Sequence, residues 1–147
     1  MDDYDFDLTY IDEEIDAHLF AAFTPENDGT LKAYTANVLI GNIPAKRLND
    51  CVGEEFQLFS YYCKKIQFED GKSGRLISLF GRNLKNTAGK RGLSSPCAYT
   101  TTSLKVYDAL RKISMVYGER LSENGVAVRI RMNKLDNDQK AYTLEVI

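Results

Sequence analysis

Residues 55–80 read EFQLFSYYCKKIQFEDGKSGRLISLF, and this stretch decides the fold class. Residues 55–68 contain five aromatic side chains in fourteen positions, a composition that favours strands. Residues 69–74 (EDGKSG) follow with Asp-Gly and Ser-Gly pairs, which supply the positive φ angles of a tight turn. Residues 75–80 then return as a partner strand. The stretch therefore predicts a β-hairpin.

Further strands are predicted on both sides of this hairpin. Residues 31–41 (LKAYTANVLIG) have the β-branched and aromatic content of a strand, and 97–102 (CAYTTT) form a short candidate. Residues 126–132 (VAVRIRM) and 140–147 (KAYTLEVI) predict a second hairpin around NKLDNDQ. The chain is therefore expected to be mainly β.

One helix is predicted between the strand candidate 97–102 and the second hairpin. Ser103 is placed to cap its N-terminus, and Gly118 follows its last residue, Tyr117. The spacing of four, three and four residues gives the helix one apolar stripe, made of Val106, Leu110, Ile113 and Tyr117.

This order of elements predicts a five-stranded OB-fold barrel with one helix after its third strand. A generic α+β sheet with one helix is the competing interpretation. We expect two regions, an acidic N-terminal arm at residues 1–17 and the OB-fold domain at 18–147.

The charge is distributed unevenly along the chain. Residues 1–28 hold ten acidic side chains and no Lys or Arg, whereas residues 29–147 hold eleven acidic and all 19 basic side chains. The larger part therefore has a net charge of +8, although the whole chain has −2. An acidic arm on a basic body indicates nucleic-acid binding.

Few residues in the chain suit catalysis or metal binding. His18 is the only histidine, and Cys51, Cys63 and Cys97 form no Cys-x-x-Cys pair. We expect no enzyme activity, no cofactor, no metal site and no disulfide framework. The acidic start and the lack of an apolar run of ~18 residues predict a cytoplasmic protein without membrane contact.

The segment from Lys64 to Arg91 holds eight basic residues and only two acidic ones. Strict alternation would place Phe59 and Tyr61 on the face opposite Phe56, Leu58 and Tyr62. Aromatic faces beside cations are what single-strand binding requires. Arg129 and Arg131 share one face of their β-strand. The loop 81–96 is expected to close over the bound DNA strand. The predicted contacts are Phe59, Tyr61, Lys64, Lys65, Lys72, Arg75, Arg82, Lys85, Lys90, Arg91, Arg129 and Arg131.

Apolar side chains alternate with acids in the arm. We expect them to dock on a neighbouring protomer, which would make the protein a homo-oligomer. These residues are Tyr4, Phe6, Leu8 and Tyr10.

Three stretches resemble a known family: residues 32–56 (KAYTANVLIGNIPAKRLNDCVGEEF), 98–113 (AYTTTSLKVYDALRKI) and 125–132 (GVAVRIRM). They look like the OB-fold single-stranded-DNA-binding proteins of phages and Gram-positive conjugative plasmids. The resemblance implies structural positions for the Gly53-to-Phe56 turn, Tyr99 and Ser103. It also implies DNA binding in plasmid conjugation or phage DNA processing. General single-strand binders carry their acidic tail at the C-terminus, whereas these acids are N-terminal.

The sequence thus predicts sequence-independent binding of single-stranded DNA, with double-stranded DNA and RNA open as ligands. One alternative is a non-catalytic protein-interaction module that uses the acidic arm. Another is a metal-dependent nuclease using arm carboxylates. The spacing of Asp3, Asp5, Asp7 and Glu14 matches a calcium loop, but Leu8 stands where that loop needs glycine.

Overall fold

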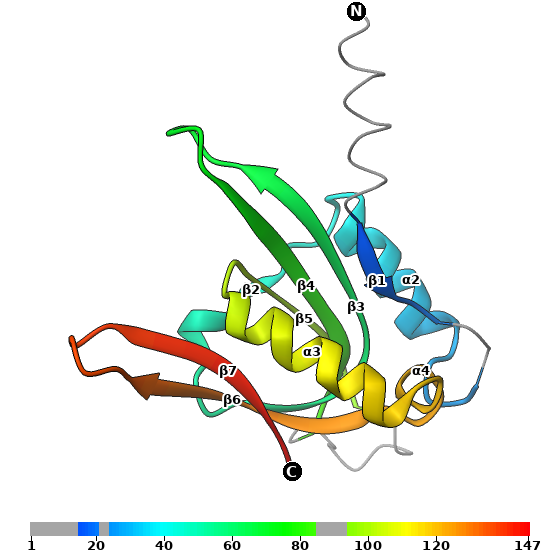
Figure 1. The fold of residues 1–147 in the computed structure, drawn as a ribbon. Helices are drawn as coiled ribbons and strands as arrows, with labels where there is room; N and C mark the ends of the chain where they lie inside the picture. Colours follow the sequence, from blue (N-terminus) through cyan, green and yellow to red (C-terminus); the bar gives the residue numbers. More distant parts are fainter. Residues whose placement is uncertain (1–14, 21–23, 85–93) are drawn as a thin grey trace, which may run out of the picture.

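The computed structural model describes residues 15–20, 24–84 and 94–147. Figure 1 shows a mainly β architecture with few helices. The strands are β1 (Asp16–His18), β2 (Lys46–Arg47), β3 (Glu55–Gln67), β4 (Ser73–Asn83), β5 (Pro96–Thr101), β6 (Val126–Lys134) and β7 (Lys140–Val146). The helices are α2 (Gly29–Leu39), the short 3-10 helix η1 (Leu48–Asp50), α3 (Leu104–Tyr117) and α4 (Arg120–Asn124).

All the strands of the described residues belong to one curled, open sheet (Figure 1). Its order is β2-β5-β4-β3-β6-β7, and β1 pairs with β3 off this path. Only β2 and β5 run parallel; the other pairs are antiparallel. β3 is central, because it pairs with β4 along most of its length and with β6 over Glu55–Leu58. The sheet thus has seven strands, where five were predicted.

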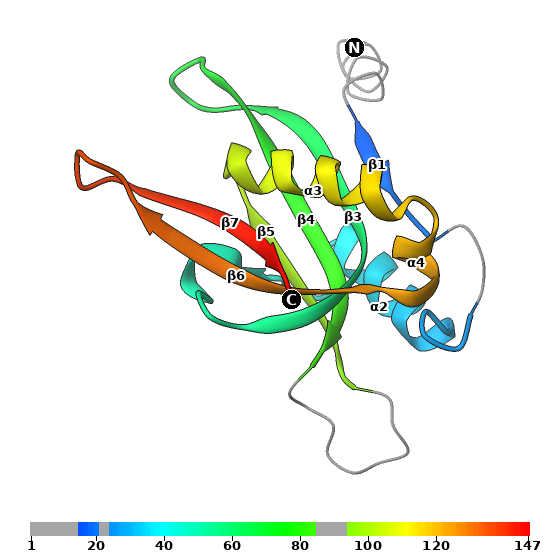
Figure 2. The ribbon, with the colours of Figure 1, turned by 60° about the horizontal axis from the view of Figure 1, so that its bottom comes forward.

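The main core lies between α3 and the hollow side of the sheet, which we call the inner face (Figure 2). Val106, Leu110 and Ile113 are buried there, and the predicted stripe is confirmed for these three residues. Tyr117 is 36% exposed and was wrongly assigned to the stripe. The predicted caps are also confirmed, because Ser103 accepts a hydrogen bond from the Val106 amide and Gly118 has a φ of 57°.

Residues 31–41 were predicted as a strand, and this prediction is wrong. They lie mostly in α2, whose first turn is capped by Asp28 through a hydrogen bond from the Leu31 amide. Gly41, with a φ of 91°, follows the helix end. Leu31 and Thr35 are buried on the side of the sheet opposite α3, which we call the outer face. The helices α2 and α4 are present in addition to α3, the single helix that was predicted.

A β-bulge interrupts β3 and exchanges its two faces. Leu58 pairs with Gly81 and Ser60 with Phe80, so Phe59 is an extra residue. Beyond the bulge, Tyr61 therefore joins Phe56 and Leu58 in the main core on the inner face. Tyr62 turns to the outer face instead.

The other strand predictions agree closely with the structure. The hairpins β3–β4 and β6–β7 and the short strand β5 are all formed. Asp16 and Ala17, which were assigned to the arm, are part of β1.

Candidate nucleic-acid interface

The two aromatic residues predicted to stack on bases are buried. Phe59 is 0% exposed and lies beside Gly125, and Tyr61 is 3% exposed. The Tyr61 hydroxyl accepts a hydrogen bond from Ser114 Oγ at 3.1 Å, and its ring stacks on His18. Neither ring is available to a ligand, so both assignments were wrong. The cause is the bulge, which turns Tyr61 towards α3.

Arg82 is buried as well, with 5% exposure, and acts as a structural anchor. Its guanidinium donates to Asp28 Oδ1 at 2.9 Å and to the carbonyl oxygens of Glu26 at 3.1 Å and Ser94 at 2.5 Å. Asp28 also caps α2. Arg82 therefore ties the start of α2 to β4, and its assignment as a nucleic-acid contact was wrong.

Arg129 and Arg131 lie on the outer face of β6, as their alternation predicted, but both form ion pairs with carboxylates. Arg129 donates to Glu55 Oε2 at 2.6 Å and to Glu145 Oε1 at 3.0 Å. Arg131 donates to Glu145 Oε1 at 2.8 Å, and this hydrogen bond is the largest cause of the lowered pKa of Glu145. Two cations and two carboxylates thus neutralise each other, which leaves no excess charge there for phosphates.

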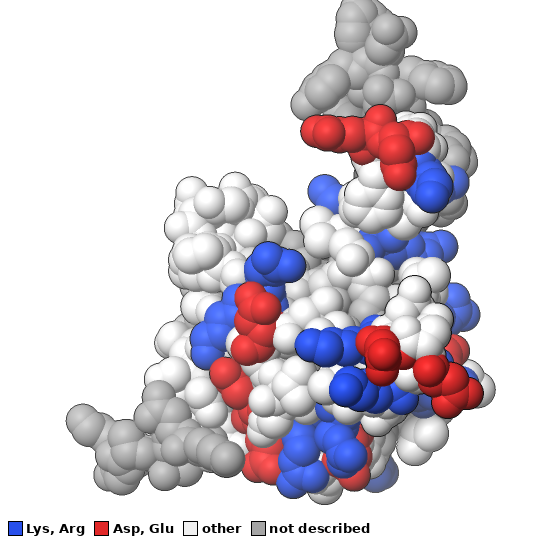
Figure 3. All heavy atoms as spheres, turned by 90° about the vertical axis from the view of Figure 1, so that its left-hand side faces the viewer, with Lys and Arg blue, Asp and Glu red and all other residues white. Residues whose placement is uncertain are grey.

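The remaining described cations of the prediction are divided between two faces. Lys64 lies on the outer face with Tyr62, whereas Lys65 and Arg75 pair across the strands on the inner face. Lys72 lies in the β3–β4 turn. Figure 3 shows basic atoms spread over one side of the molecule together with acidic groups, without one continuous basic band. The predicted contacts Lys85, Lys90 and Arg91 and the arm residues Tyr4, Phe6, Leu8 and Tyr10 lie outside the described residues.

A groove of about 300 Å³ lies on the outer face of β3, β4 and β5. Tyr62 and Lys64 of β3 and Leu76 and Ser78 of β4 line its floor together with Thr100 of β5. Its wall is the end of α2 and the connection that follows, namely Val38, Leu39, Gly41, Ile43, Pro44 and Ala45. We call this feature the outer groove.

The outer groove continues into a second hollow of about 200 Å³, since Leu76 and Thr100 line both. The second hollow adds Arg47, Asn49, Thr101 and Thr102. The two linings contain two cations, an aromatic ring and several hydroxyl groups, and among the described residues no acidic side chain lines either of them.

The two cations of this surface have weak partners or none. Among the described residues, Lys64 forms no ion pair. Arg47 lies 3.9 Å from Asp50, but the two side chains are 79% and 69% exposed, so water screens this pair. Both cations are therefore available to an anionic ligand.

Sequence reasoning missed Tyr62 and Arg47. Alternation without a bulge placed Tyr62 on the face of Phe56 and Leu58, and Arg47 lies outside every strand and helix that was predicted. The glycine at position 81 was the available signal, because a Cβ there would lie 1.9 Å from the Gln57 carbonyl oxygen. Glycine inside a strand often marks a bulge.

Other chemical groups of the described residues are dispersed. Cys51, Cys63 and Cys97 are free and buried, and burial raises the pKa of each thiol. Burial also lowers the pKa of His18. Within residues 15–20, 24–84 and 94–147, no three His, Cys, Asp or Glu side chains gather as metal ligands would. None of the helices in that part is long and apolar enough to cross a membrane.

Comparison of the chain with known families, with curated proteins and with solved structures finds no match.

Proposed function

We propose that this protein binds single-stranded DNA in the outer groove, independently of sequence and without chemistry on the DNA. The observation that carries the proposal is the composition of the groove. Tyr62 offers an aromatic ring beside Lys64, and Arg47 lies in the adjoining hollow. No acidic side chain of the described ranges lines either part. Stacking on such a ring contributes ~1–3 kcal/mol per base, whatever the base is.

The order of the elements supports an OB-type arrangement for this site. The strands β3, β4, β5, β6 and β7 would be the five barrel strands, with α3 between the third and the fourth. The first of them pairs with both the second and the fourth. OB folds are partly open barrels that bind oligonucleotides on the face of their second and third strands. On this assignment those strands would be β4 and β5, which carry the outer groove.

The shape of the groove favours unpaired bases over a duplex. Its volume is near the lower end of the range for ligand pockets, roughly 300–1,000 Å³. A ring in such a pocket can be stacked only if the base is free of its partner strand. The hydroxyl groups of Ser78 and Thr100 line the groove as further hydrogen-bonding groups, whereas the Thr101 hydroxyl already donates to Asn49 Oδ1.

Fluorescence anisotropy of a labelled oligo-dT tests the proposal, with two single variants compared with the wild type. We expect Tyr62→Leu to weaken binding about 5- to 150-fold, which is the loss of one stacked base. Lys64→Ser should lower the slope of log K against log salt by about 0.7, because one phosphate contact is lost.

The matched controls are Tyr117→Leu and Lys112→Ser, which remove the same groups from the exposed surface of α3. They should leave both the affinity and the salt slope unchanged. Thermal unfolding of all four variants verifies that each is folded. If folded Tyr62→Leu binds as tightly as the wild type, the outer groove is not the binding site. If the wild type binds no oligonucleotide at low salt, the proposed function is wrong.

A further inference from the structure

Both hairpins carry a like-charged pair on the inner face. Lys65 pairs across the strands with Arg75 on the β3–β4 hairpin, and Lys134 pairs with Lys140 on the β6–β7 hairpin. Alternation places the first pair on the same side as Cys63 and Ile77, and the second on the same side as Ile130 and Leu144. Those apolar residues belong to the core under α3. The two cation pairs therefore lie on the inner face, further towards the tips of the hairpins than the core residues.

Like charges directly opposite each other destabilise a sheet. The β6–β7 hairpin avoids this on its outer face, where Arg129 is opposite Glu145 and donates to it. On its inner face the same hairpin places lysine opposite lysine. The turn between them carries Asp136 and Asp138, yet within the described part of the chain neither lysine forms an ion pair. Hairpin stability does not explain this pair, and an external anion would.

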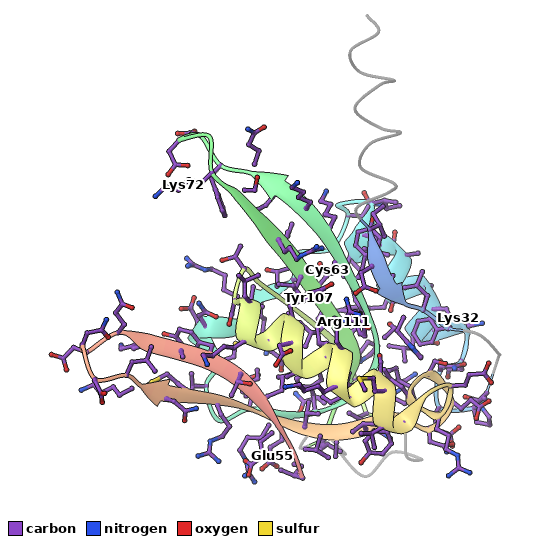
Figure 4. The ribbon with its side chains drawn as sticks, viewed as in Figure 1. Lys32, Glu55, Cys63, Lys72, Tyr107 and Arg111 are labelled. Atoms are coloured by element: carbon purple, nitrogen blue, oxygen red, sulfur yellow. The ribbon has the colours of Figure 1, made fainter. Side chains whose placement is uncertain are left out.

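The helix between the two hairpins adds further groups that bind anions. The Tyr107 ring of α3 lies 4.7 Å from the Arg75 guanidinium and 5.8 Å from that of Arg111. The Tyr107 hydroxyl donates to Asp16 Oδ2 at 2.9 Å, and Arg111 lies 3.7 Å from the same oxygen. Figure 4 shows Tyr107 and Arg111 on the side of α3 that faces β3. A carboxylate oxygen is thus already bound at this end of the inner face.

We propose that Lys65, Arg75, Lys134 and Lys140 form a second surface, the hairpin cation surface, that binds the sugar–phosphate backbone of a nucleic acid. This inference rests on the proposed function and extends its site. The cations are divided between two hairpins that project on the same side of the molecule (Figure 1). Charges spread in this way match a polyanion with regularly spaced phosphates, and a single small anion would need them to converge.

The outer groove and the hairpin cation surface lie on opposite faces of the β3–β4 hairpin. A DNA strand that contacts both surfaces must pass around this hairpin, so only a longer oligonucleotide can occupy both surfaces at once. Short oligonucleotides should use the outer groove alone. The affinity for oligonucleotides should therefore depend on their length. Variants of the outer groove should affect both short and long oligonucleotides, and variants of the hairpin cation surface only the long ones.

The experiment measures the affinity of oligo-dT of about 6 and about 25 nucleotides, since sites of single OB folds span ~4–16 nucleotides. The test variant is Lys134→Ser with Lys140→Ser. For the long oligonucleotide its salt slope should be smaller than that of the wild type by about 1.4, at ~0.7 per contact. From 50 to 200 mM salt, the wild type should then lose about sevenfold more affinity than the variant. Affinity for the short oligonucleotide should not change.

The control is Lys112→Ser with Arg120→Ser, which removes the same charge from exposed helix positions, and its salt slope should equal that of the wild type. An unchanged slope for the Lys134/Lys140 variant would overturn this inference and leave the outer groove in place. If that variant loses binding while Tyr62→Leu does not, the hairpin cation surface stands and the outer groove is wrong. If the wild type binds neither length, both proposals fail.

Discussion

Replacement of Arg82 by methionine should destabilise the protein by about 3 kcal/mol. The guanidinium donates to one carboxylate and two carbonyl oxygens, and its side chain is almost wholly buried. Removal of one partner of a buried ion pair costs ~3–5 kcal/mol, because the remaining charge is left without compensation. Asp28 is 23% exposed and keeps its hydrogen bond from the Leu31 amide, so water can partly solvate it. The lower end of the range therefore applies.

Urea unfolding at neutral pH, followed by circular dichroism, measures this loss. With a slope of ~2 kcal/mol/M, a loss of about 3 kcal/mol lowers the midpoint by about 1.5 M. Arg82→Lys keeps the charge and loses the planar fork, so its midpoint should lie between those of wild type and Arg82→Met. Arg47→Met is the matched control, because its pair with Asp50 is exposed, and it should change stability by less than ~0.5 kcal/mol.

Two results would refute this reasoning. A loss below ~1 kcal/mol for Arg82→Met would mean that Arg82 does not anchor α2 to β4. A folded Arg82→Lys variant that binds oligo-dT more weakly than the wild type would make Arg82 a nucleic-acid contact, as the sequence first predicted.

Two further predictions concern the packing of the sheet. Gly81→Ala should destabilise the protein by more than ~3 kcal/mol, because the added Cβ would lie 1.9 Å from the Gln57 carbonyl oxygen. Gly29→Ala is the control in the same urea assay, because a Cβ at position 29 has no heavy atom within 4 Å. Burial raises the pKa of Cys97 to about 12 from an ordinary value near 9. The Cys97 thiol therefore ionises at lower pH in the unfolded chain than in the folded protein. The free energy of unfolding should fall as the pH rises from 9 to 12, and it should fall less in Cys97→Ala. An equal fall in the wild type and in Cys97→Ala would contradict the raised pKa of Cys97.

The error at residues 31–41 shows how local composition can mislead. Tyr34, Thr35, Val38 and Ile40 favour a strand by propensity, yet they form or adjoin a helix. The segment TPENDG before them contains Asp28, a good N-cap residue that favours a helix after it. Propensity was overridden because α2 buries Leu31 and Thr35 against the outer face of the sheet.

The error at the predicted site has a different cause. Alternation assigns faces correctly only while a strand keeps its period of two. One extra residue, Phe59, shifts that period and replaces Tyr61 by Tyr62 on the outer face. The types of residue expected at the site, an aromatic ring beside cations, are present on that face. Lys64 is one of the positions first chosen, whereas Tyr62 and Arg47 are not.

The sequence by itself determined the two hairpins, the capped helix α3, the mainly β character and the separation of acidic from basic segments. These features depend on neighbours within a few residues, through turn geometry, capping and periodicity. Only the tertiary structure decided which cations remain available, because their partners are distant in the chain. Arg129 binds Glu55 and Arg82 binds Asp28, 74 and 54 residues away. Such pairs form only when the sheet brings remote strands into register, and no local pattern predicts them.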